Sequence, residues 1–133
     1  MGHVRLLLDT HCWLWLKLDP TRLPSPLRRR LSGDPATLAL SAASVLEIAI
    51  KHAAGRLKLE GTPADLVDGL LDDGVSALPI AAAHALQVGR LPTLHRDPFD
   101  RLLVAQAIIE GLTVVSADPR VLAYDVRKID ARK

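Results

Sequence analysis

The chain has 133 residues, a formal net charge of +2 and 49% hydrophobic residues, enough apolar material to close one substantial core. Only 3% of the residues are aromatic, so the core must consist mainly of Leu, Ala, Val and Ile, a mixture that favours α/β layers over all-β folds. The single cysteine, Cys12, excludes an internal disulfide, a cysteine-based zinc site and a CxxC redox motif. The sequence therefore predicts one domain over residues 1–133, in a reducing compartment.

Apolar runs alternate with amphipathic stretches along the chain. Short continuous apolar runs predict strands that are buried on both faces, whereas apolar residues three or four positions apart predict helices. In chain order we predict strand Val4–Leu8, helix Cys12–Leu18, helix Pro24–Leu31, strand Thr37–Leu40, helix Ser41–Lys58, helix Gly61–Leu71, strand Val75–Ile80, helix Ala81–Val88, helix Pro98–Glu110, strand Thr113–Ser116, helix Arg120–Tyr124 and strand Val126–Ile129. The alternation predicts a parallel sheet covered by helices on both faces.

No apolar segment has the length of a membrane anchor or a secretion signal. The run within Met1–Leu8 is far shorter than the hydrophobic region of a signal peptide, and nowhere do about 18 uncharged apolar residues follow one another. We therefore expect a soluble, cytoplasmic protein without membrane contact. Basic residues cluster at Arg28–Arg30 and near the C-terminus, but such clusters usually form solvated surface, so charge alone does not predict nucleic-acid binding.

Four carboxylates fall at junctions between the predicted elements. Asp9 follows the first strand and Asp118 the fourth, while Asp100 lies in the first turn of the longest helix. Glu47 lies in the first turns of the helix after the second strand. Ligands of open parallel sheets bind beyond the carboxyl ends of the strands, where these acids are expected. Clustered carboxylates need a counter-charge, and oxygen ligands favour magnesium or manganese over zinc.

Helix capping is the competing interpretation of the acids. Asp97-Pro98 and Asp118-Pro119 have the form of an N-cap followed by proline at the first helical position. Ser44–Glu47 matches a capping box, in which the glutamate bonds back to the cap. Asp9 could also cap the helix after it, although Thr10 could serve equally well. The convergence of four acids on one sheet edge favours a shared site over capping alone.

Four segments of the sequence together resemble the PIN-domain ribonucleases, and among them the VapC-like toxins of bacterial toxin–antitoxin pairs. The segments are Leu6–Trp15, Ser41–Lys51, His95–Ala107 and Val114–Pro119. The third is the most specific, and the four span nearly the whole chain in the family's order. Two positions depart from the pattern, because Leu46 stands where tryptophan is often found and Ser116 where threonine is usual. Neither departure removes a carboxylate, and the hydroxyls of Thr10 and Ser116 are candidates for orienting the acids.

The resemblance implies a three-layer α/β/α sandwich with a parallel sheet of four to five strands. It implies a magnesium- or manganese-dependent endoribonuclease that hydrolyses RNA phosphodiester bonds. Asp9, Glu47, Asp100 and Asp118 would be the catalytic and metal-binding acids, with Asp97 as a candidate fifth metal ligand. The resemblance also implies a small cognate antitoxin as partner and a homodimer.

Two arginines and two histidines near the acids have candidate roles. Arg96 and Arg101 flank the acids and are candidate phosphate contacts, although arginines beside acids more often form plain ion pairs. His11 and His95 are candidate proton shuttles, a role that a bound metal would also supply.

Other classes of protein compete with the nuclease. A haloacid-dehalogenase-type phosphatase needs a second aspartate two residues after the first, where this chain has His11. A receiver domain needs paired acids after its first strand, and here Asp9 stands alone. The alternative from a different class is a catalytically silent PIN-like module that acts through protein or RNA contacts, whose acids only cap helices. A metal titration separates it from the nuclease.

Overall fold

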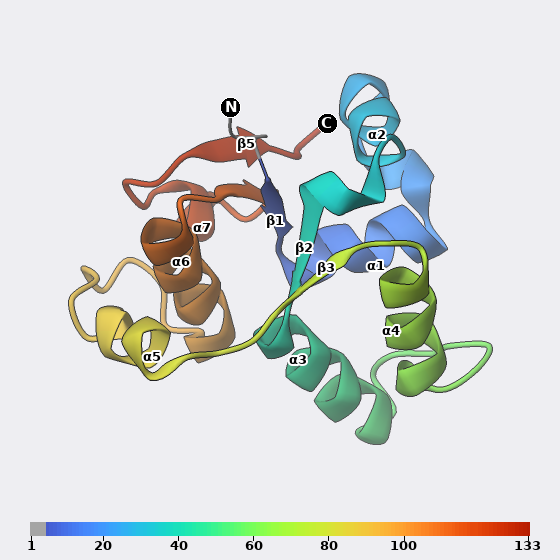
Figure 1. Cartoon of the computed structure of the whole chain (residues 1–133), viewed down its shortest axis with the longest axis horizontal. Coiled ribbons are helices and arrows are strands. Elements are labelled where there is room, and N and C mark those ends of the chain that lie inside the picture. The colour runs from blue at the N-terminus through green and yellow to red at the C-terminus, as the bar shows by residue number, and fades with distance from the viewer. Residues whose placement is uncertain (1–4) are drawn as a thin grey trace.

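The computed structural model describes residues 5–133 of the chain. In this range the strands are β1 (Leu6–Leu8), β2 (Leu38–Ser41), β3 (Ser76–Leu78), β4 (Thr113–Ser116) and β5 (Lys128–Asp130). They form one all-parallel sheet in the order β3-β2-β1-β4-β5 (Figure 1). The predicted parallel sheet is therefore confirmed. Val4, predicted to begin the first strand, lies outside the described residues, and β5 begins later than predicted because Val126 packs into the core instead.

Helices connect the strands and cover the sheet. They are α1 (Thr10–Leu18), α2 (Ser25–Leu31), α3 (Ala42–Ala53), α4 (Pro63–Asp72), α5 (Ala82–Val88), α6 (Pro98–Glu110) and α7 (Pro119–Leu122), with short 3-10 turns η1 (Pro20–Arg22) and η2 (Pro35–Thr37). None of the helices described in residues 5–133 combines the length and the apolar character needed to cross a membrane.

The sheet separates two hydrophobic cores, because successive side chains of a strand point to opposite faces. Leu6 and Leu8 pack into one core with Trp13 of α1 and residues of α2 and α4. Leu7 packs into the other core with Leu103 of α6, with residues of α7 and with residues of the loop that follows α5. Full burial of each such leucine stabilises the fold by about 1.5–3 kcal/mol. Figure 1 shows α1, α2 and α4 on one side of the sheet and α5, α6 and α7 on the other, which confirms the three-layer sandwich.

The strand order reverses at β1, which lies between β2 and β4. The chain first extends the sheet through β2 to β3 and later adds β4 and β5 on the other side of β1. Leu8 pairs with Val115 of β4, and the backbone N–H of Asp9 donates to the Val115 carbonyl at 3.0 Å. The carboxyl ends of β1 and β4 are thus held side by side, at the topological switch point where ligands of open α/β sheets bind.

Helix α3 is shorter than predicted, ending at Ala53 rather than at Lys58. Gly55 adopts the left-handed region with a φ of 75°. The N–H of Arg56 then bonds back to the Lys51 carbonyl at 2.9 Å, which satisfies a carbonyl at the end of the helix. The apolar spacing continues past this glycine, so periodicity alone overestimated the helix.

Candidate active site

Asp9 is buried at the carboxyl end of β1, with both carboxylate oxygens held. Its Oδ1 accepts a hydrogen bond from the backbone N–H of Cys12 at 2.8 Å and thereby caps α1. Its Oδ2 accepts from the Ser116 hydroxyl at 2.5 Å. Ser116 therefore orients this acid across the β1–β4 pair, whereas the Thr10 hydroxyl donates to Ser44 at 3.0 Å and touches no acid. Asp9 can cap α1 and also face the site, because the cap occupies Oδ1 and the bond from Ser116 occupies Oδ2.

Asp100 lies in the first turn of α6, behind the N-cap Asp97. The Asp97 Oδ1 accepts from the N–H groups of Phe99 at 2.8 Å and Asp100 at 3.3 Å, so the predicted cap is present. Burial, followed by the charges of Asp97 and Asp9, raises the pKa of Asp100 to about 7; His95 opposes this rise, and Glu47 adds to it. The charges of Asp97, Asp9 and Glu47 act on this pKa because the fold places these acids near Asp100.

His95 is buried against two of the acids. Its Nε2 lies 2.8 Å from the Asp100 Oδ2 and 3.3 Å from the Asp118 Oδ2. One ligand atom of each of these three residues lies within 4.8 Å of the other two. On the sequence alone, His95 is only a candidate proton shuttle. The signal in the sequence that could have identified it is its place at the start of the segment His95–Ala107, which resembles the family.

Asp118 caps α7 at the end of β4 and is held by Arg120. Its Oδ1 accepts from the backbone N–H of Arg120 at 2.8 Å, and its Oδ2 pairs with the Arg120 guanidinium at 3.3 Å. Burial by itself would raise the pKa of Asp118, but the hydrogen bonds and charge of Arg120, with a contribution from His95, outweigh it and lower that pKa. Arg120 was not among the residues predicted from the sequence, and the fold places it beside Asp118.

Glu47 does not belong to the predicted capping box. Ser41, not Ser44, caps α3 by accepting from the Ala43 N–H at 3.0 Å, so Glu47 lies in the second turn of the helix. Its Oε2 pairs with the Lys51 ammonium at 2.9 Å. Its Oε1 is buried without a hydrogen-bond partner among residues 5–133. A buried carboxylate oxygen left unpaired is costly, so this oxygen is suited to a ligand.

A pocket of about 230 Å³ opens beside the acids and is lined by Asp9, His11, Trp15, Ala117 and Asp118. The neighbouring thiol of Cys12 is fully buried, and burial first and Asp9 second raise its pKa well above the usual range. The thiol therefore stays protonated and offers no thiolate ligand. Oxygen donors dominate the site, which suits magnesium or manganese. The predicted ligand set therefore fits a hard divalent cation.

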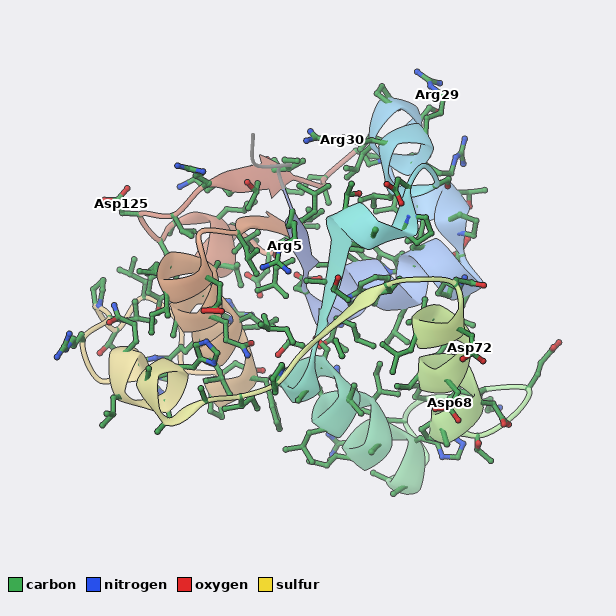
Figure 2. The ribbon with its side chains drawn as sticks, viewed as in Figure 1. Arg5, Arg29, Arg30, Asp68, Asp72 and Asp125 are labelled. Atoms are coloured by element: carbon green, nitrogen blue, oxygen red, sulfur yellow. The ribbon has the colours of Figure 1, made fainter. Side chains whose placement is uncertain are left out.

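The two predicted phosphate-binding arginines differ in the structure. Arg96 is exposed. Arg101 instead donates from Nη2 to the carbonyls of Val88 at 2.9 Å and Leu91 at 3.5 Å, so its guanidinium holds the end of α5. The basic cluster of α2 is remote from the acids. Figure 2 shows Arg29 and Arg30 pointing outward near the start of β2, whereas α3 begins at its other end.

The family model of the PIN domain matches residues 6–127 of the chain. The chain belongs to the PIN domain family. This match confirms the resemblance found in the sequence and covers the strands and helices that carry Asp9, Glu47, Asp100 and Asp118. A comparison with curated proteins finds no match.

Solved structures share this PIN domain fold. VapBC2 from Rickettsia felis, bound to a DNA fragment from its promoter, gives a TM-score of 0.73 at 16% identity, covering 96% of this chain and 98% of that chain. DNA-bound VapBC from Salmonella typhimurium gives 0.70 at 18% identity, with the same coverage. VapBC-5 from Mycobacterium tuberculosis, of the VapBC family of toxin-antitoxin systems, gives 0.58 at 19% identity, covering 98% and 100%. At these identities the likeness establishes the shared fold.

The raised pKa of Asp100 predicts a pH-dependent difference in stability between the metal-free protein and its Asp100→Asn variant. In the unfolded chain Asp100 titrates near 3.8 and in the folded chain at about 7. The contribution of Asp100 to the free energy of unfolding is therefore fully present below the pKa of the unfolded chain, and it is lost as the pH rises through the pKa of the folded chain. In EDTA, the Tm of the variant should exceed that of the parent by a few degrees more at neutral pH than near pH 4. A difference that does not change with pH contradicts the raised pKa.

Proposed function

We propose that this chain is a magnesium- or manganese-dependent endoribonuclease and the toxin of a toxin–antitoxin pair. The observation that carries the proposal is the convergence of Asp9, Glu47, Asp100 and Asp118 at the switch point, with the buried Glu47 Oε1 unpartnered within residues 5–133 and the pKa of Asp100 raised to about 7. A divalent cation would balance the negative charge of the acids and bind to the Oε1 of Glu47.

In this proposal Asp9 and Asp100 ligate the cation directly, and Glu47 and Asp118 complete its shell or position water. When bound, the cation would polarise a phosphoryl oxygen of RNA and lower the pKa of a water nucleophile. The residues of the chain hold the acids in place. Asp97 stays a predicted fifth ligand, with its cap on α6 as its observed role.

Arg96 is the arginine that we propose for phosphate contact, because its side chain is exposed one residue from the cap of α6. Arg101 is not included, since its guanidinium already serves backbone carbonyls. The half-buried Trp15 at the pocket wall could stack on a base of the RNA.

We infer the partners from the shared fold and from the surface. The VapBC structures named above support a small cognate antitoxin as partner. Large apolar side chains are exposed at Leu46 and Ile50 of α3 and at Ile80 beyond β3, and exposed apolar surface of this kind favours protein contacts. A homodimer is the second proposed assembly.

A catalytically silent binding module is the second candidate, and the capping bonds favour it. Asp9, Asp97 and Asp118 each cap a helix, so each has a structural use without metal. This candidate gives no use to the buried Oε1 of Glu47, which has no hydrogen-bond partner in the described part of the chain. Calorimetric titration with Mn²⁺ separates the two, because the silent module should show no saturable binding at one or two sites.

Cleavage of RNA should depend on a divalent cation. The purified chain, free of antitoxin, should cut a fluorescent structured RNA with Mg²⁺ or Mn²⁺. Excess EDTA should abolish cleavage until the metal is restored, because without a cation the acids repel one another and no water is activated as the nucleophile. The measurement is the initial rate of RNA cleavage, with a DNA strand of the same sequence in parallel. RNA cleavage that persists undiminished in EDTA contradicts the metal mechanism, and cleavage confined to DNA contradicts the substrate.

A further inference from the structure

We propose that His95 is a positioning residue, which donates a hydrogen bond from Nε2 to Asp100 and lies against Asp118, and that it does not itself ligate the cation. This inference rests on the proposed function, because the acids it positions are the proposed ligands. The Nε2 atom lies 2.8 Å from the Asp100 Oδ2 and 3.3 Å from the Asp118 Oδ2. The two acids come from different elements, α6 and the end of β4, so one ring nitrogen joins two parts of the site.

The other ring nitrogen decides which role Nε2 can have. His95 Nδ1 accepts a hydrogen bond from the backbone N–H of Asp97 at 3.3 Å. An accepting nitrogen carries no hydrogen, so the ring hydrogen must be on Nε2. A nitrogen that carries hydrogen has no lone pair for a cation, whereas it is a donor for a carboxylate. Histidines that ligate metals usually show the opposite arrangement, in which the second nitrogen donates to a carbonyl or a carboxylate.

The ring is fixed in this orientation from its backbone outward. The N–H of His95 donates to the hydroxyl of Tyr124 at 3.1 Å, and Tyr124 is only 1% exposed in the core under α6. Asp97, whose N–H reaches Nδ1, is itself tied to the first turn of α6 as its N-cap. The His95 side chain is 4% exposed. A rotation of the ring that moved the two nitrogens would leave the Asp97 N–H and the Asp100 carboxylate without their hydrogen-bond partner.

The consequence for the site is preorganisation of its acids. The hydrogen bond from Nε2 holds the Asp100 Oδ2 in place, and the same nitrogen lies 3.3 Å from the Asp118 Oδ2, so it keeps the two oxygens near one point despite their like charges. The same bond fixes the direction of the other Asp100 oxygen, Oδ1, because the two oxygens belong to one planar carboxylate. Removing the donor should let the two acids move apart and should weaken cation binding, as loss of an outer-shell hydrogen bond does in other metal sites.

Two substitutions at His95 separate donation from bulk. His95→Leu removes the donor, and we expect it to weaken Mn²⁺ binding about ten-fold or more. In His95→Gln the side-chain amide places an N–H near the position of Nε2, so Mn²⁺ affinity and RNA cleavage should stay within about three-fold of the parent, well short of the loss expected when an outer-shell bond is removed. Affinity is measured by the loss of the free Mn²⁺ signal in electron paramagnetic resonance, and folding by circular dichroism.

His84 provides the matched control. It is 4% exposed, and its Nδ1 also accepts a backbone N–H, that of Ala81 at 2.9 Å. Its Nε2 faces Glu110, at the opposite end of α6 from Asp100. His84→Leu should therefore leave Mn²⁺ affinity unchanged wherever the variant is folded, even though it also removes a buried histidine. Mn²⁺ affinity of His95→Leu equal to that of the parent overturns the positioning role.

Two measurements on the parent protein do not depend on whether a variant folds. Long-range ¹⁵N–¹H spectra of the metal-free protein should show the His95 hydrogen on Nε2; a hydrogen on Nδ1 overturns the inference even if the proposed nuclease proves correct. With Mn²⁺ bound, electron spin echo modulation should show no ¹⁴N coordinated to the ion. If a coordinated nitrogen is seen and disappears in His95→Gln, His95 is a ligand and the inference is wrong. A parent that binds no Mn²⁺ and cleaves no RNA contradicts the proposed function instead, and the spectra of the metal-free protein still decide the orientation of the ring.

Discussion

Replacing Asp9 or Asp100 by asparagine should lower metal-dependent RNA cleavage by about a hundred-fold or more, while the fold is preserved. Loss of an outer-shell partner alone costs about 10–100-fold in metal sites, and these two acids are proposed to ligate directly. Asparagine keeps the shape of aspartate and an oxygen acceptor, so the Asp9→Asn side chain could still cap α1 at the N–H of Cys12. What each substitution removes is one negative charge at the cation. The measurements are the cleavage rate at saturating Mg²⁺ and the Tm.

Asp125→Asn is the control for these substitutions. Asp125 is exposed and lies at the outer edge of the molecule before β5, as its label in Figure 2 shows. The substitution removes the same charge from the chain, so it should leave the cleavage rate within about two-fold of the parent, because an exposed distant charge is screened by salt. Parent-like cleavage by both site variants would remove Asp9 and Asp100 from the proposed chemistry.

Glu47→Gln should produce a folded protein whose cleavage rate is lower by about ten-fold or more. The structure removes the capping interpretation of this residue, because the cap of α3 is Ser41. The Glu47 Oε1 is buried without a partner among the described residues, and its Oε2 pairs with Lys51 at 2.9 Å. Glutamine keeps the size of the side chain and an oxygen acceptor but removes the charge that a cation would neutralise. Cleavage rate and Mn²⁺ affinity should therefore fall together.

Two controls distinguish loss of the cation from loss of the fold. Glu60→Gln makes the same chemical change at an exposed residue outside the site and should cleave like the parent. Ser41→Ala removes the true cap of α3 and also the hydrogen bond that the buried hydroxyl donates to Gln106, so it should destabilise the protein by more than the ~1 kcal/mol typical of a lost cap. If Glu47→Gln cleaves normally, Glu47 belongs to the scaffold and the site consists of aspartates alone.

Much of the fold could be predicted because its signals are local. The run Leu6–Leu8 is apolar throughout, and Thr113–Ser116 is apolar between its two polar ends, as strands buried on both faces require. Pro98 marks the start of α6 because its ring fixes φ near the helical value, and Gly111 marks the end because it adopts the left-handed region without a Cβ clash. Boundaries failed where two local signals competed, as at α3, where a left-handed Gly55 ended a helix that the apolar spacing continued.

The places of the acids at the ends of strands and helices could be predicted for the same reason, whereas their contacts could not. Asp9 directly follows a strand signal, Asp118 lies two residues after another, and Asp100 lies in the first turn of a predicted helix, so the sequence alone placed them at one edge of the sheet. It did not determine that Ser116 would bond to Asp9, 107 positions away in the chain. That bond exists because β1 and β4 are neighbours, and strand order is decided by packing of the whole chain.

The sequence by itself thus determined the strand and helix alternation and the acids at the ends of the strands, because strand burial and helix capping depend on residues within a few positions of one another. Only the tertiary structure decided which polar groups meet. It assigned the cap of α3 to Ser41 rather than Ser44, directed Arg101 to backbone carbonyls and placed His95 between Asp100 and Asp118. The physical reason is that a hydrogen bond depends on distances of a few tenths of an ångström and on direction, and these are set by how distant elements pack against the sheet.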